Sequence, residues 1–114
     1  MKIDVRFRAL ASSEALREHA VRRIHLHLSR FGSDIDSVLV RLSDVNGPKG
    51  GLDKQCQVTV RGPNFSAVVT NDLSADAWSA VDLAVERAGR AVGRDLERVR
   101  AVRRSLVEPV DLLG

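Results

Sequence analysis

The chain has 114 residues, with 18 Lys and Arg against 15 Asp and Glu, which gives a net charge of +3 at pH 7. This length suits a single domain, and the only cysteine, Cys56, excludes both an intramolecular disulfide and a metal site built from several thiolates. No apolar run approaches the ~20 residues that span a bilayer, and the N-terminus lacks the apolar stretch of a secretory signal, so we expect a cytoplasmic protein.

The first part of the chain predicts a strand, a helix and a second strand. Residues 2–8 alternate between apolar and polar side chains, as a strand with one buried face does. A helix is expected over residues 13–31, with Ser12 or Ser13 as its N-cap. Residues 38–43 alternate again and predict the second strand.

The middle of the chain predicts two further strands. A connector rich in Gly, Asn and Pro, residues 46–51, leads into a third strand over residues 55–60. A fourth strand follows, and we expect Phe65, Ala67 and Val69 to point from it into the core. Each of these strands has one apolar face.

Beyond residue 74 the sequence predicts one long amphipathic helix. Asp72 or Ser74 can cap its start, and Pro109 is expected to set its outer limit. Its apolar stripe consists of Trp78, Val81, Val85, Ala88, Val92, Leu96 and Val99. We expect Trp78 to anchor the helix in the core, the alternative being that it stacks on an RNA base.

The element order is β-α-β-β-β-α, which predicts an α+β fold. One four-stranded sheet with both helices packed on one face, as in double-stranded-RNA-binding domains, buries every apolar face. We expect one domain over residues 1–106 and a short flexible tail over residues 107–114.

The other face of this sheet should be open and polar. It is expected to display four polar side chains: Arg6, Arg8, Arg41 and Thr59. Leu39 and Val68 are predicted to point outward on the same face, where they could form a protein contact or a weak homo-oligomer.

Seven arginines lie between residues 87 and 104. Four of them recur every three or four residues and should form one ridge along the last helix: Arg87, Arg90, Arg94 and Arg98. Three acids are expected on the opposite flank of that helix: Asp82, Glu86 and Glu97. We interpret the ridge as an unneutralised surface for a polyanion, extended from the first helix by Arg22, Arg23 and Arg30. The alternative is a solvated face with ion pairs such as that of Glu86 and Arg90, each worth ~0.2–0.5 kcal/mol.

Three histidines and two glycines have simpler interpretations. His19, His25 and His27 point in different directions around the first helix, so they do not form a metal site. His27 lies within the apolar stripe of the first helix, which consists of Leu16, Ala20, Ile24 and Phe31, and its protonation should destabilise the fold at mildly acid pH. Gly89 and Gly93 should allow close approach of the first helix, and Cys56 should be a core residue.

Two segments are similar to one known family. Residues 13–18, Ser-Glu-Ala-Leu-Arg-Glu, resemble its Thr-Glu-Ala-Leu-Arg-Glu, and residues 76–82, Asp-Ala-Trp-Ser-Ala-Val-Asp, resemble its Asp-Met-Tyr-Ala-Ala-Ile-Asp. Basic residues follow at positions where the family carries Lys or Arg. The family is that of the short ribosome hibernation-promoting factors, also called ribosome-associated inhibitor A or ribosomal subunit interface proteins, and the resemblance covers roughly residues 1–100.

The resemblance implies a non-enzymatic factor that binds rRNA of the small ribosomal subunit near the decoding region and blocks mRNA and tRNA, in response to stress. Six arginines would contact rRNA: Arg23, Arg87, Arg90, Arg94, Arg98 and Arg100. Lys2 and Arg22 would be peripheral contacts. We expect no cofactor, metal ion, membrane or small-molecule substrate. Two alternatives stay open, a regulatory module that binds a protein through the sheet face and a generic domain for structured RNA.

Overall fold

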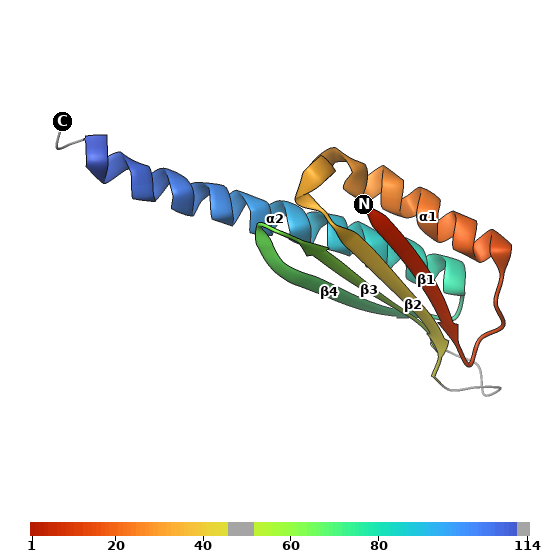
Figure 1. Cartoon of the computed structure of the whole chain (residues 1–114). Coiled ribbons are helices and arrows are strands. Elements are labelled where there is room, and N and C mark those ends of the chain that lie inside the picture. Colours follow the sequence, from red (N-terminus) through yellow and green to blue (C-terminus); the bar gives the residue numbers. More distant parts are fainter. Residues whose placement is uncertain (46–51, 112–114) are drawn as a thin grey trace.

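The computed structural model describes residues 1–45 and 52–111, and their side chains as far as residue 106. Four strands form one sheet: β1 (Lys2–Arg8), β2 (Ser37–Asp44), β3 (Lys54–Gly62) and β4 (Phe65–Ser74). Helix α1 (Glu14–Leu28) continues into a 3-10 segment, η1 (Ser29–Asp34), and helix α2 (Ala77–Asp111) ends the described chain. The predicted α+β class and element order are therefore confirmed (Figure 1).

The strands lie in the order β1-β2-β3-β4 across the sheet. The β1–β2 pair is parallel and is connected through α1, whereas β2–β3 and β3–β4 are antiparallel. Helix α2 packs on β3 and β4, and α1 packs beside α2 and near β1. Both helices thus cover one face, and the other face stays open (Figure 1). The predicted connector of residues 46–51 lies outside the described residues.

The core lies between the sheet and the two helices. Alternate residues of the central strands are buried there: Val38, Val40, Leu42, Cys56, Val58 and Val60. Helix α1 contributes Ile24 and Leu28, and α2 contributes the middle of its apolar stripe, from Val81 to Leu96. Because the strand alternation and the helical stripe both point into this layer, one hydrophobic core holds the sheet and the helices together.

The first helix is shorter than predicted. Ser13 is its N-cap, as expected, because the backbone N–H of Leu16 donates to Ser13 Oγ at 3.1 Å. The α-helix ends at Leu28, and the chain then narrows to 3-10 geometry. Gly32 within η1 has a φ of 55°, a left-handed value that favours glycine. This turn brings Arg30 and Phe31 beside α2.

The fourth strand differs from the prediction in the side chains that face the core. Val68 and Thr70 are buried, while Ala67 is exposed and Val69 is 52% exposed. Only Phe65 packs against the core as expected. The cause is a register irregularity between Val60 and Gly62 on β3, which shifts the inward set of β4 by one residue. The open face therefore presents Val69 rather than Val68.

The start of α2 also differs from the prediction. Its N-cap is Asp76, which accepts hydrogen bonds from the backbone N–H of Trp78 at 3.1 Å and from Ser79 Oγ at 3.2 Å. Asp72 and Ser74 cannot cap the helix because β4 runs through Ser74. Trp78 is 40% exposed and contacts the His19 ring, with centroids 4.7 Å apart, so it does not anchor α2 in the core.

Helix α2 extends well past the edge of the sheet (Figure 1). Its 35 residues correspond to a helix about 50 Å long, and the molecule measures 68 × 23 × 17 Å. The helix passes the predicted limit at Pro109 and ends at Asp111. The division into a domain over residues 1–106 and a tail stays a prediction. Neither helix, as far as it is described, is long and apolar enough to cross a membrane.

Candidate nucleic-acid interface

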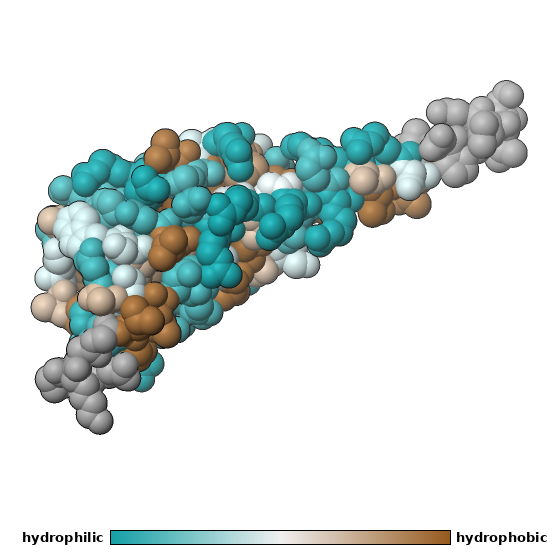
Figure 2. All heavy atoms as spheres, turned by 180° about the vertical axis from the view of Figure 1, so that it is seen from behind, coloured by the Kyte–Doolittle hydropathy of each residue, from teal (hydrophilic) through white to brown (hydrophobic). Residues whose placement is uncertain are grey.

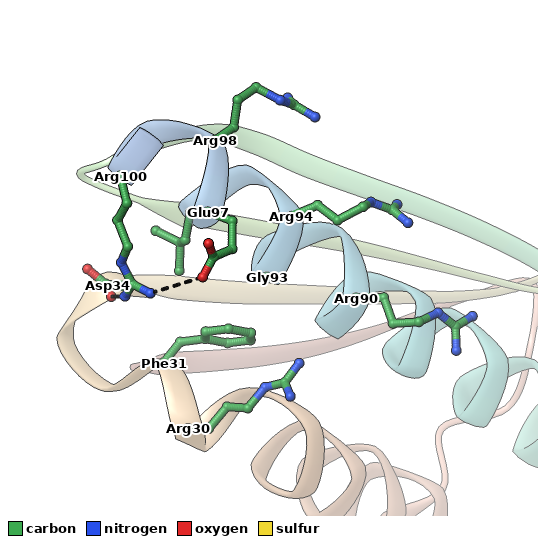
Figure 3. A pocket seen from close by; sticks show the side chains of 10 residues that line it. Arg30, Phe31, Asp34, Arg90, Gly93, Arg94, Glu97, Arg98 and Arg100 are labelled. Carbon is green, nitrogen blue, oxygen red and sulfur yellow. Dashed lines mark ion pairs between the residues drawn. The ribbon is translucent and has the colours of Figure 1, made fainter. Parts of the chain in front are cut away.

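A groove of about 830 Å³ lies between α2 and the segment that follows α1. Five arginines line it: Arg30, Arg90, Arg94, Arg98 and Arg100. Figure 3 shows that Arg90, Arg94 and Arg98 extend from α2 in the same direction, as the ridge spacing predicted. Arg30 approaches them from the neighbouring segment, whereas Arg100 turns away toward Asp34.

Two glycines of α2 shape the contact with the first helix. A Cβ atom at Gly89 would lie 3.1 Å from the backbone oxygen and 3.3 Å from the Cβ of His27, so the two helices approach closely there, as predicted. At Gly93 the nearest atoms would be 3.7 Å away, on Arg30 and Phe31. The helices are therefore tightly packed at Gly89 and leave room for the groove at Gly93.

The arginine ridge is largely neutralised, which corrects the prediction. Three of its members have carboxylate partners: Arg87 with Asp72 at 2.9 Å, Arg90 with Glu86 at 2.7 Å and Arg98 with Asp95 at 3.3 Å. Arg100 also lies within 3.8 Å of both Asp34 and Glu97. Among the residues that the structure describes, Arg94 is the one ridge arginine without an ion pair.

The prediction failed because opposite flanks on a helical wheel do not keep long side chains apart. Glu86 lies one turn before Arg90, a spacing at which both side chains meet. Asp72 comes from β4 and reaches Arg87 across the sheet edge, a contact that no helical pattern contains. Arg87 Nη1 also donates to the backbone oxygen of Asn71 at 3.3 Å.

These ion pairs weaken the positive potential without removing it. Exposed pairs contribute about 0–1 kcal/mol and are screened by salt. The side chain of Arg90 is 57% exposed and that of Arg98 is 73% exposed, so a phosphate can replace the carboxylate at either one. Arg87 is held more firmly, because the side chain of its partner Asp72 is only 15% exposed.

Arg23 connects the two helices. Its Nε lies 3.2 Å from Asp82 Oδ1 on α2, and its Nη2 donates to His27 Nε2 at 3.0 Å. Asp82 Oδ1 also accepts from His19 Nε2 at 2.6 Å. The present contacts of Arg23 are thus structural. Lys2 and Arg22, the two peripheral candidates, are exposed and lack ion pairs within the described part of the chain.

His27 is half-buried at the helix contact. Burial lowers its pKa below the ordinary value of 6.5, and the nearby positive charge of Arg23 lowers it further. The hydrogen bond from Arg23 fits the neutral ring, since Nε2 must accept it. No group of three or more His, Cys, Asp or Glu among the described residues could hold a metal ion.

Cys56 is a core residue, as predicted. It is fully buried in β3, and burial raises the pKa of its thiol to about 12. A thiol of this kind is a poor nucleophile near neutral pH.

Arg30 and Phe31 are the residues of the groove that sequence reasoning underestimated. The Arg30 guanidinium carbon lies 4.7 Å from the centroid of the Phe31 ring, an arrangement that holds the charge at the groove. Arg30 entered the sequence analysis only as an extension of the basic patch. Its place beside Arg90 and Arg94 depends on the 3-10 turn and on helix packing, which local spacing does not encode.

The fold and the groove define a small α+β domain with a basic surface beside its second helix. Residues 3–100 match the family model described as "Sigma 54 modulation protein / S30EA ribosomal protein", and the chain belongs to this family. The family predicted from the sequence is thereby confirmed.

Two solved structures share the fold. The Thermus thermophilus Protein Y N-terminal domain is 25% identical, with a TM-score of 0.67 over 82% of this chain and 98% of that one. A ribosomal subunit interface protein from Coxiella burnetii is 21% identical, with a TM-score of 0.68 over 82% of this chain and 96% of that one. No curated protein sequence matches the chain significantly.

Proposed function

We propose that this protein is a cytoplasmic, non-enzymatic factor that binds small-subunit rRNA near the decoding channel and silences translation there, as the hibernation factors it resembles do. Membership of the S30EA ribosomal protein family supports a ribosomal target. The main observation in favour of an rRNA contact is the groove, where Arg30 and Arg94, which form no ion pair with any described residue, add positive charge beside Arg90 and Arg98.

The chemistry of the groove suits the RNA backbone. A guanidinium can donate two parallel hydrogen bonds to one phosphate. Arg30 and the α2 arginines approach the groove from its two sides, so an RNA strand lying between them would meet donors on both flanks. Backbone contacts carry little base preference, and recognition would then depend on the shape of the rRNA.

Inhibition would be steric. A domain whose helices and sheet share one core has little freedom to yield, and when bound in the channel it would exclude mRNA, tRNA and initiation factors by competition. Glu86 and Asp95 must give way where phosphates approach Arg90 and Arg98. We therefore expect binding that is weaker than the number of arginines suggests and that falls steeply with salt.

The test is the double variant Arg30→Glu/Arg94→Glu. Neither side chain forms an ion pair within the described residues, so the exchange should leave the fold intact. We expect affinity for purified small subunits to fall roughly 100-fold or more at physiological salt, because two phosphate contacts become repulsive. Cosedimentation in sucrose gradients measures this loss, and circular dichroism confirms folding.

The matched control is Arg103→Glu/Arg104→Glu, which changes the net charge equally on the exposed end of α2. An equal loss in the control would show that overall charge, and not the groove, decides binding. Undiminished cosedimentation of the folded groove variant would reject the groove as the contact. A large excess of an unrelated A-form RNA duplex should compete poorly, since effective competition would indicate generic binding of structured RNA.

A further inference from the structure

The open face of the sheet carries a second basic hollow, far from the groove in the fold. Its volume is about 600 Å³, and it lies over β1, β2 and β3. Six polar side chains line it: Arg6, Arg8, Arg41, Ser43, Gln55 and Gln57. Since both helices cover the other face of the sheet, this hollow belongs to a separate surface (Figure 1).

The strand register explains why the three arginines gather. Arg6 on β1 lies directly opposite Arg41 on β2, and neighbouring strands are about 4.8 Å apart. Arg8 lies two residues further along β1 and points to the same face, about 6.6 Å away along the strand. Like charges directly opposite each other destabilise a sheet. The arrangement therefore costs folding energy that a bound anion would offset.

Few acids compensate this charge. Asp4 Oδ2 pairs with Arg6 Nε at 2.9 Å on the same face. Arg8 and Arg41 are exposed, and within residues 1–45 and 52–106 neither forms an ion pair. In contrast to the ridge arginines Arg87, Arg90 and Arg98, they are available without displacing a carboxylate.

The neighbouring side chains are donors and acceptors that suit a nucleic acid strand. Ser43 Oγ donates to Gln55 Oε1 at 3.5 Å, and Gln55 Nε2 donates to Asn71 Oδ1 at 3.3 Å. These amides and hydroxyls lie on three neighbouring strands, β2, β3 and β4, and can bond ribose hydroxyls and base edges. Phe7 also lines the hollow, but its ring packs against the core and lies under the Arg17 guanidinium, so base stacking would contribute little.

An acidic peptide fits this hollow less well than RNA. Extended peptides usually bind at the free edge of a sheet, where unpaired backbone groups supply hydrogen bonds. The hollow lies on the face of β1, β2 and β3 and reaches as far as Gln55 and Gln57, so it is not confined to the outer edge of β1, and the backbone groups of β2 and β3 are already paired on both sides. Side chains alone are available there, and guanidinium clusters match phosphates in charge and geometry.

We propose that the open sheet face is a second RNA-binding surface, on which Arg8 and Arg41 hold the phosphates of a single strand with Arg6 beside them. The protein then holds RNA on both sides, at the groove by α2 and at the sheet. This second surface does not rest on the ribosomal target of the proposed function, because its ligand is defined by the phosphates and riboses of any single-stranded segment.

The probe is a short fluorescein-labelled oligouridylate, and fluorescence anisotropy measures its affinity. Arg8→Gln/Arg41→Gln is compared with Arg103→Gln/Arg104→Gln, which removes the same charge from the end of α2. Both double variants are made in the wild type and in an Arg30→Gln/Arg94→Gln background, in which RNA binding at the groove is weakened.

We expect the Arg8→Gln/Arg41→Gln variant to bind the oligonucleotide about tenfold more weakly in both backgrounds. The slope of log affinity against log salt concentration should be smaller by about 2, because two phosphate contacts are removed. The side-chain amide NMR signals of Gln55 and Gln57 should shift when the oligonucleotide is added, including in the weakened-groove background. Both residues line the hollow and so report on it directly.

Three outcomes would overturn the proposal: an equal loss in the control, unchanged Gln55 and Gln57 signals, or stronger binding of polyglutamate than of the oligonucleotide. The last result would assign the face to an acidic protein. Cosedimentation with small subunits reads the proposed function separately. Both proposals would be supported if the Arg30→Glu/Arg94→Glu variant lost ribosome binding while the oligonucleotide still shifted the Gln55 and Gln57 signals. If the wild type itself did not bind ribosomes, the proposed function would fail, but the anisotropy and NMR measurements would still test RNA binding at the sheet face.

Discussion

The two sides of this molecule carry their positive charge differently. On the helix side most of the ridge arginines have carboxylate partners within a turn or on the adjacent strand. On the open sheet side Arg8 and Arg41 have none among the described residues. The arginine ridge of α2, which the sequence predicts as the main basic surface, is therefore the more neutralised of the two. The spacing of charges predicts where they lie, while their free charge depends on contacts across the fold.

The secondary structure explains this difference. Along a helix, residues three or four apart share a face, so an acid in a basic segment can usually reach an arginine. Along a strand, successive side chains alternate between faces. Asp72 illustrates the separation, because it lies opposite the buried Cys56 and pairs with α2 rather than with the open face. Asp4 is the exception, because it lies two residues before Arg6, shares its face and pairs with it.

The prediction with the largest expected effect compares two leucines on β2. Leu42 is 1% exposed and faces the helices, whereas Leu39 is half-buried and points to the open face. We expect Leu42→Ala to lower the free energy of unfolding by about 2–5 kcal/mol, because it leaves a cavity in the core. Leu39→Ala should cost only about 1 kcal/mol, since less apolar area is lost. Urea unfolding measures both.

The same two variants test whether the sheet face is open for a ligand. A cost for Leu39→Ala as large as that for Leu42→Ala would mean that the open face is packed against something in solution, such as a second copy of the chain. In that case the sheet arginines would not be freely accessible. A small cost that does not change with protein concentration supports the open face.

A second, smaller test compares the two glycines of α2. Gly93→Ala should stabilise the protein by up to about 1 kcal/mol, because alanine favours the helix and its methyl group meets only ordinary contacts. Gly89→Ala should gain nothing or destabilise, because its Cβ would press on the backbone of His27 at 3.1 Å. Thermal unfolding of both variants gives the difference. Equal stabilisation would contradict the close helix contact at Gly89.

Much of the fold could be predicted from local patterns. Alternation in β1, β2 and β3 identified their buried faces, because the β1–β2 and β2–β3 pairs keep a regular register. β4 could not be predicted in the same way, since the irregularity between Val60 and Gly62 arises from its pairing with β3. Trp78 matches the apolar stripe of α2 but lies in the first turn of the helix, where it packs on His19 and stays exposed.

The candidate site could be predicted only in part. The helical period placed Arg90, Arg94 and Arg98 on one side of α2, and the structure confirms that common direction. The groove depends on contacts between distant segments, namely the position of Arg30 on η1 and the room left at Gly93. Whether any of these arginines contacts rRNA stays a prediction that the Arg30→Glu/Arg94→Glu variant tests.

The tip of α2 marks a further contrast between the buried and exposed parts of one helix. Val92 and Leu96 are buried over the sheet, whereas Val102 is 55% exposed and Leu106 is 71% exposed beyond its edge. Figure 2, seen from the side opposite to Figure 1, shows hydrophobic atoms near this end of the molecule as well as on parts of its body. The helical spacing of apolar residues thus continues along α2, but these residues pack against the sheet only in the first half of the helix. In the second half they contact no other described part of the chain.

The smallest expected effect is a pH dependence at the helix contact. The pKa of His27 is lowered in the folded protein, mainly by burial and then by Arg23, although Glu86 opposes the shift. In the unfolded chain the ring should titrate near its ordinary value of 6.5. The unfolded state therefore binds a proton first as the pH falls, and stability should be complete above that value and decrease below it, until the pH passes the folded pKa. Protonation would also remove the acceptor for Arg23 Nη2 and add a positive charge near Arg30 and Arg90.

His27→Gln keeps an oxygen that can accept from Arg23 but does not titrate, so its melting temperature should fall less than that of the wild type between about pH 7.5 and about pH 5. If both proteins lose the same amount, His27 is not the group whose protonation weakens the contact between α1 and α2.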